Sequence, residues 1–321
     1  MAPLIRLRRS RRLPGFVDQA PVPAVADPLE AFRFFAVVKT WMDEDIIEAT
    51  VRNAMVQGVE RVFIIDNGST DDTLSIARAA GAEIAEVYHT EVFDGRLAQS
   101  LMNAVVARES LRSGAAHIWW LHLDADEFPE GRHGVSVSHV LAGLDRRVRV
   151  VGARFVNHYP DRPPHAVPGF HPGEFQPWCA PMVVQRSHCE RHHWKHPLQR
   201  FDRHGHFVMS WPGAHGANCS ERLAEPPEDI VVRHFRYRDE QRTRDKLDAA
   251  CGPGSRRTAL HESVGYDAFV VRRRSLDAVY GRRWAEVEDL TGTPDWFDSA
   301  GLRRWYSVDD LAQVTGDQRG G

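Results

Sequence analysis

Two acidic segments contain the side chains best suited to chemistry. The first begins at Asp66, which ends a hydrophobic run and precedes the turn-forming pair Asn67-Gly68. Ser69 and Thr70 follow, and either residue can cap the next helix. Turn and cap formation explain most of this segment, but they do not explain Asp66. A carboxylate at the end of a strand can accept a hydrogen bond from a base N–H or a ribose hydroxyl.

The second segment is Asp124-Ala125-Asp126-Glu127, which directly follows the hydrophobic run 118–123. Three carboxylates this close repel one another, so they persist most easily where a cation compensates them. Asp124 and Asp126 can both approach one hard divalent ion. Mg²⁺ and Mn²⁺ prefer oxygen ligands and leave positions for substrate phosphates. An exposed acidic turn is the alternative, but the position at a strand end favours the metal site.

The elements that position these residues alternate along the chain. Hydrophobic runs at 34–38, 61–65, 84–88 and 118–123 indicate buried strands, and helical spacing over 44–57, 70–81 and 97–106 separates them. This alternation predicts an α/β fold with a mostly parallel sheet and helices on both faces. The carboxyl ends of such strands share one edge, where ligands bind.

The second half of the sequence differs from the first in composition. Residues 157–230 are rich in Pro, His, Trp and Gly, which predicts a loop-rich, partly antiparallel region, and 239–250 and 266–290 are predicted C-terminal helices. We therefore expect a flexible basic and proline-rich leader at 1–30, an α/β half at 31–156, a second half at 157–290 and an extension at 291–321.

These motifs resemble the family 2 type of nucleotide-sugar glycosyltransferase, in its bacterial subgroup with DNGSTD and DADEF motifs. The resemblance is strongest over residues 33–130, where DNGSTD is 66–71 and DADEF is 124–128. A weaker similarity to this subgroup covers His234-Phe235-Arg236-Tyr237-Arg238, followed by Lys246. The resemblance implies the GT-A fold and a metal-dependent transfer of sugar from a nucleoside diphosphate sugar to an acceptor hydroxyl. It also implies that 31–156 is the nucleotide-sugar-binding half and 157–290 the acceptor-binding half. The segment 39–43 departs from the usual pattern after the first strand.

The resemblance also implies roles for individual residues. Mn²⁺ or Mg²⁺ would be the cofactor, held by Asp124 and Asp126, and it would neutralise charge on the leaving diphosphate. His234 is the candidate third ligand, and His215, flanked by small residues, competes with it. The residues expected to bind the nucleotide sugar are Asp66, Asn67, Asp72, Asp124, Arg236 and Lys246.

An inverting course, which is usual for this family, needs a carboxylate that deprotonates the acceptor hydroxyl. Glu174, in a proline-rich segment, is the first candidate. Glu127, beside the metal motif, and Asp202 are the others. Asp202 has arginines close on both sides, which favours a structural ion pair.

Two other functions fit parts of the sequence. A phosphotransferase or phosphatase would use Asp124 as nucleophile and Asp126 as acid. A non-catalytic, zinc-stabilised interaction module would use the histidine-rich stretch, where ten of the 17 histidines lie between His158 and His215. Its Cys and His spacings match no familiar zinc pattern. These side chains fit the lining of an aromatic acceptor groove better.

Composition limits the partners of the chain. The 321 residues carry a formal net charge of −3, which argues against a general nucleic-acid binder. Four cysteines are too few for a disulfide scaffold, so we expect a cytoplasmic protein. The arginine-rich start allows at most peripheral contact with the inner face of a membrane. The expected partners are a nucleoside diphosphate sugar and a saccharide, lipid-linked or protein acceptor.

Overall fold

A computed structural model describes residues 27–91, 93–131, 134–160, 162–176, 178–181, 184–186, 190–192, 194–204, 209–210, 214, 217–218, 230–251, 276–281 and 303–304. None of the helices in these residues is long and apolar enough to cross a membrane.

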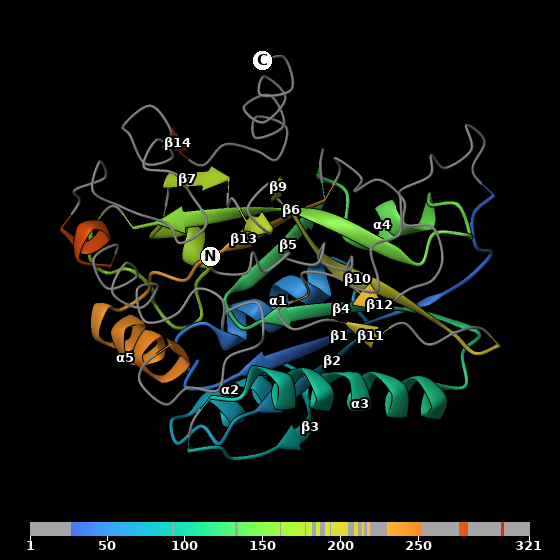
Figure 1. Cartoon of the computed structure of the whole chain (residues 1–321), viewed down its shortest axis with the longest axis horizontal. Coiled ribbons are helices and arrows are strands. Elements are labelled where there is room, and N and C mark those ends of the chain that lie inside the picture. The colour runs from blue at the N-terminus through green and yellow to red at the C-terminus, as the bar shows by residue number, and fades with distance from the viewer. Residues whose placement is uncertain are drawn as a thin grey trace, which may run out of the picture.

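The first half confirms the predicted alternation of strands and helices (Figure 1). Its elements are β1 (Arg33–Thr40), α1 (Ile47–Val56), β2 (Arg61–Asp66), α2 (Thr73–Ala79), β3 (Glu83–Val87), α3 (Gly95–Ser113) and β4 (His117–Asp124). The expected cap of α2 is wrong, because Asp72 is the residue before the helix, and Ser69 and Thr70 lie in the preceding loop.

The second half adds mostly short strands. Its elements are β5 (Glu127–Gly131), α4 (Val137–Ala142), β6 (Val150–Tyr159), the 3-10 turn η2 (Pro172–Glu174), β7 (Trp178–Pro181), β8 (Val184–Arg186), β9 (Glu190–His192), β10 (Trp194–Asp202), β11 (Met209–Ser210), β12 (Ala217–Asn218), β13 (Ile230–His234), α5 (Glu240–Cys251) and β14 (Arg303–Arg304). The predicted helix at 239–250 is confirmed as α5. Of the helix predicted at 266–290, the structure describes 276–281, and 276–280 are helical.

One mixed sheet joins the two halves. Its main path runs β14-β7-β6-β10-β4-β1-β2-β3, and β13 pairs with both β5 and β6 beside it. The four strands β3, β2, β1 and β4 are parallel, as predicted, whereas β10 is antiparallel to β4 and to β6. The expected boundary at 156/157 falls inside β6, so both halves share the sheet.

Helices cover the two faces of the parallel strands. Residues of α1, α2 and α4 pack with Phe34, Ala36 and Val38 on one face. On the other face, α3 packs with Phe35 and Val37, and Figure 1 shows it running along the sheet. Burial on both faces explains the continuous hydrophobic runs of the strands. The acidic segments therefore lie at one edge of the sheet, at the carboxyl ends of the parallel strands β2 and β4.

Candidate donor and metal site

Asp66 lies at the carboxyl end of β2, as predicted, and its side chain accepts hydrogen bonds from within the protein. The side chain is fully buried, and its two oxygens accept hydrogen bonds from the backbone N–H (2.8 Å) and the hydroxyl (2.5 Å) of Ser69. Asp66 therefore shapes the loop. Its expected contact with a nucleotide stays a prediction.

The rest of the DNGSTD segment is also engaged in local structure. Asn67 accepts hydrogen bonds from the backbone N–H and the hydroxyl of Thr90, both at 3.2 Å, which ties the loop after β2 to the loop after β3. Asp72 is exposed at the start of α2, and its backbone N–H donates to Glu44 (3.2 Å). The segment thus builds one edge of the site, where Asp72 is exposed.

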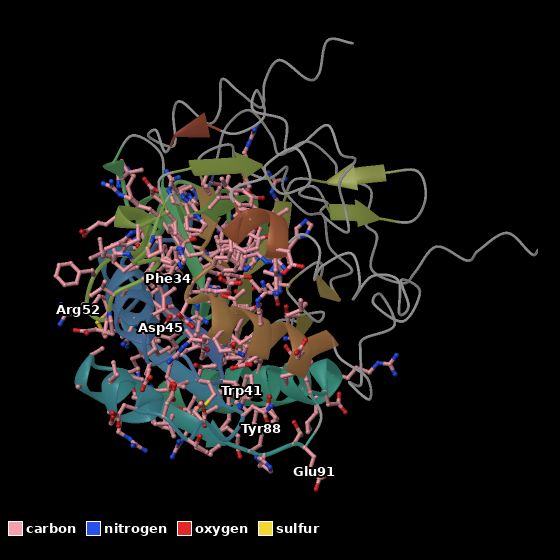
Figure 2. The ribbon with its side chains drawn as sticks, turned by 90° about the vertical axis from the view of Figure 1, so that its left-hand side faces the viewer. Phe34, Trp41, Asp45, Arg52, Tyr88 and Glu91 are labelled. Carbon is pink, nitrogen blue, oxygen red and sulfur yellow. The ribbon has the colours of Figure 1, made fainter. Side chains whose placement is uncertain are left out.

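The loop after β1 crosses the same edge. Met42 has φ of 54°, a left-handed conformation that is uncommon for residues other than glycine. Its backbone N–H donates to the Ser69 hydroxyl (2.8 Å), and its carbonyl accepts from Arg242 on α5 (3.0 Å). Figure 2 shows Trp41 in this loop and Tyr88 in the loop after β3. Contacts from both halves of the chain therefore fix the loop.

A group of buried charges joins this loop to α5. The carboxylate of Asp43 forms an ion pair with the guanidinium of Arg238 at 2.7 Å and also contacts the ammonium group of Lys246. Burial alone would raise the pKa of Asp43, but these two cations hold it below its usual value. Arg238 also pairs with Asp45 (2.6 Å) and is 1% exposed. Lys246 thus forms an ion pair within the protein, and its expected role in nucleotide binding stays a prediction.

Asp124 ends β4 beside Lys39 of β1. The two residues are register partners in the parallel pair, and Lys39 Nζ lies 2.9 Å from Asp124 Oδ1. Burial opposes the charge on Lys39, but Asp124 outweighs it, so the pKa of Lys39 is raised. Both side chains remain partly exposed, at 24% and 32%. The pair is therefore accessible to a ligand at the edge of the sheet.

Glu127 begins β5 and faces inward. One of its oxygens accepts from Lys195 of β10 at 2.6 Å, and the other accepts from the backbone N–H of Asp124 at 3.3 Å. The two side chains are 3% and 7% exposed. Burial raises the pKa of Glu127, with Asp124 adding to it and Lys195 opposing it. Glu127 therefore fixes the turn of the DADEF motif, and an acceptor hydroxyl has no access to it.

Asp126 and His234 come together because β13 pairs with β5. His234 is the register partner of Glu127, and the backbone N–H of Phe235 donates to the carbonyl of Asp126 (2.9 Å). As a result, His234 Nε2 lies 3.5 Å from Asp126 Oδ2. The other ring nitrogen, Nδ1, donates to Asn157 Oδ1 of β6 at 2.8 Å. This hydrogen bond directs Nε2 toward Asp126.

The electrostatic environment keeps Asp126 ionised. Burial would raise its pKa, but His234, Arg238 and Lys246 outweigh burial and hold the pKa well below its usual value. The carboxylate is 22% exposed, so it keeps access to the surface. An ionised oxygen beside a directed imidazole nitrogen is a donor pair that suits a divalent cation.

This donor pair is smaller than the predicted metal site. In the described part of the chain, no group of three or more His, Cys, Asp or Glu side chains is arranged to hold a metal ion. Asp124 forms an ion pair with Lys39, and His215 lies outside the described residues. A pair nevertheless fits Mg²⁺ or Mn²⁺, because these ions are commonly held by one or two protein groups, substrate phosphates and water.

The remaining candidates separate in space. Asp202 pairs in register with His117, at the opposite end of β4 from Asp124, and it forms ion pairs with Arg149 and Arg200. These ion pairs fit the structural role that its neighbouring arginines favoured, and the length of β4 separates Asp202 from Asp124. Arg236 is half-buried, and its guanidinium lies 5.1 Å from the ring of Tyr237.

Glu174 ends η2 and is exposed. The residue before this turn, His171, packs its ring against Phe128 (4.9 Å) and Phe235 (5.6 Å), which follow Glu127 and His234 in the chain. The turn therefore lies beside both motifs of the site. In the histidine-rich stretch considered for zinc, His158 and His196 are buried, and the side chains of 178–194 lie outside those that the structure describes.

Sequence reasoning missed three residues of the site. Lys39 was visible only as part of the unusual segment after β1. The roles of Asn157 and Lys195 depend on how β6 and β10 pair with distant strands. A search for polar residues inside otherwise apolar strands would have found Asn157.

Comparisons with known proteins add little to this geometry. The sequence matches no known protein-family model and no curated protein. It is similar to the solved structure of glucosyl-3-phosphoglycerate synthase from Mycobacterium tuberculosis with Mn²⁺, UDP and glucosyl-3-phosphoglycerate, at 19% identity over 38% of this chain and 44% of that chain, with a TM-score of 0.25. The complex of that synthase with Mg²⁺ and UDP gives 17% identity, 38% and 43% coverage and the same TM-score.

A further match is described only as a mycobacterial protein, at 20% identity over 40% of this chain and 42% of that chain, with a TM-score of 0.25. The chain thus spans less than half the length of the solved proteins it matches. Because a TM-score this low carries no argument, the conclusions below depend on the geometry of the chain itself.

Proposed function

We propose that the chain is a metal-dependent glycosyltransferase of the family 2 type, which transfers a sugar from a nucleoside diphosphate sugar to an acceptor hydroxyl. The observation that carries the proposal is the approach of Asp126 Oδ2 to His234 Nε2, at 3.5 Å. Asn157 accepts a hydrogen bond from the other ring nitrogen, so Nε2 faces this carboxylate. Two such groups attract each other only when a cation, either a proton or a metal ion, compensates them.

Each residue of the site has its own role in this proposal. Asp126 and His234 would hold Mn²⁺ or Mg²⁺, which supplies charge neutralisation on the diphosphate leaving group. Asn157 holds the ring of His234, and Glu127 holds the backbone of the motif. Asp124, partly exposed at the strand end, is placed to accept hydrogen bonds from a sugar or ribose hydroxyl.

The base of an inverting reaction is proposed to be Glu174. Of the three carboxylates considered, Glu127 is bound to Lys195 and Asp202 lies at the far end of β4. Glu174 is exposed and belongs to the turn packed beside Phe128 and Phe235. A saccharide, lipid-linked or protein acceptor would approach this turn, and we propose that its hydroxyl gives its proton to Glu174.

A phosphotransferase or phosphatase is the weaker function. It requires Asp126 to act as a general acid, which must hold a proton near neutral pH. The surrounding cations hold the pKa of Asp126 well below its usual value, so this carboxyl does not retain one. This environment suits a metal ligand instead.

The proposal is tested by thermal unfolding of the full chain with UDP, GDP, CDP, ADP or dTDP, each with and without Mn²⁺. We expect at least one nucleotide with Mn²⁺ to raise the midpoint temperature well above the value for Mn²⁺ alone, because a ligand that binds only the folded state stabilises it. If no nucleotide exceeds the metal alone, the donor site is absent and the proposal fails.

Replacing Asn157 with leucine is expected to weaken Mn²⁺ binding about 10- to 100-fold, the usual effect of removing an outer partner of a ligating histidine. The reason is that His234 loses the acceptor that orients its ring. Asn157→Asp restores an acceptor of the same size and should retain most of the affinity. Titration of Mn²⁺ followed by the loss of its free-ion EPR signal provides the measurement. Equal affinities in Asn157→Leu and the unmodified chain would remove Asn157 from the site.

A further inference from the structure

The ion pair between Lys39 and Asp124 has no counterpart in the predicted site. Lys39 Nζ lies 2.9 Å from Asp124 Oδ1, and both residues stand at the carboxyl edge of neighbouring parallel strands. Both side chains are partly exposed, at 24% and 32%. Partly exposed ion pairs contribute little to stability, so stability alone does not account for a cation at this position.

Lys39 also differs from the other cations near this edge. Arg238 and Lys246 are held by Asp43, and Lys195 is held by Glu127 inside the protein. Lys39 instead pairs with a carboxylate of the DADEF motif itself. Its positive charge therefore acts directly on the site where a divalent ion and a diphosphate would bind.

The sign of this effect is opposite for the two ligands. A fixed positive charge disfavours a nearby Mn²⁺ and favours a nearby diphosphate. Asp124 and Asp126 provide two negative charges, and Lys39 cancels one of them. The attraction that these two carboxylates offer to a divalent ion by itself is therefore weakened.

We infer that Lys39 is a built-in cation of the donor site, which makes the divalent ion bind weakly alone and tightly together with the nucleoside diphosphate. The inference rests on the proposed function. Its consequence is that ion and nucleotide enter as a pair, so the site does not fill with metal when no donor is present.

The test uses Lys39→Met, which keeps most of the stem and removes the charge, and Lys39→Arg, which keeps the charge. The matched control is Arg52→Met, because Arg52 is exposed on α1 and pairs with Glu48 (Figure 2). Mn²⁺ alone is titrated by EPR. The nucleoside diphosphate that gives the largest thermal shift is then titrated by calorimetry at saturating Mn²⁺.

We expect Lys39→Met to bind Mn²⁺ alone roughly tenfold more tightly and the nucleotide with Mn²⁺ roughly tenfold more weakly, as expected for one unit charge at short range. Lys39→Arg and Arg52→Met should match the unmodified chain in both titrations. Thermal unfolding of each variant confirms that it is folded before it is titrated.

Two affinities that move in the same direction, or do not move, overturn the inference. This failure is distinct from failure of the proposed function. In that case the unmodified chain itself would bind none of the nucleotides in the presence of Mn²⁺.

Discussion

Replacing Asp126 with asparagine is expected to weaken the binding of nucleoside diphosphate in the presence of Mn²⁺ by at least about 100-fold, since the loss of even an outer partner of a metal ligand has a 10- to 100-fold effect. The substitution keeps the size of the side chain but removes the ionised oxygen beside His234 Nε2. Calorimetric titration of the nucleotide at fixed Mn²⁺ gives the affinity.

The control for this experiment is Glu86→Gln. Glu86 lies on β3 at the end of the sheet path, where its carboxylate is 3.7 Å from Arg108. The substitution removes one negative charge, as Asp126→Asn does, but at a position away from the site. We expect the control to bind nucleotide as the unmodified chain does. An Asp126→Asn variant that retains full affinity would show that this carboxylate does not hold the ion.

The second large effect concerns the buried pair of Glu127 and Lys195. We expect Lys195→Met to lower the free energy of unfolding by about 3–5 kcal/mol, because it leaves a buried carboxylate without its cation. The double variant Glu127→Gln with Lys195→Met removes both charges and should be more stable than Lys195→Met alone. Urea unfolding of the single and double variants measures this coupling.

The destabilisation by Lys195→Met should also depend on pH. Burial raises the pKa of Glu127, and removing Lys195 raises it further. A carboxyl whose pKa is higher in the folded than in the unfolded state favours folding at low pH, and this stability is lost as the pH rises through the folded value. The variant should therefore be less destabilised at pH 5 than at pH 8. Equal destabilisation at both values would contradict a buried, ionised Glu127.

The parallel half of the fold follows from local patterns, and the sequence predicts it well. Continuous hydrophobic runs such as 118–123 are required wherever a strand is covered on both faces, and the helices between them show helical spacing. That alternation was enough to place Asp66 and Asp124 at one edge. The position of Asp66 was right, whereas the two hydrogen bonds that it accepts from Ser69 were not expected.

The partners of the acidic residues depend on pairing between distant strands, which the sequence does not contain in local form. The approach of His234 to Asp126 depends on the register of β13 with β5. The contact of Lys195 with Glu127 depends on the placement of β10 between β4 and β6. Resemblance alone suggested His234, and no pattern suggested Lys195.

Pulsed EPR of Mn²⁺ bound to the chain with a nucleoside diphosphate tests the central claim most directly. It detects ¹⁴N from a ligating imidazole and ³¹P from the diphosphate on the same ion. We predict both couplings in the unmodified chain and loss of the ¹⁴N coupling in His234→Ala. A ³¹P coupling without ¹⁴N in the unmodified chain, or a ¹⁴N coupling that survives His234→Ala, would contradict a donor site built on Asp126 and His234.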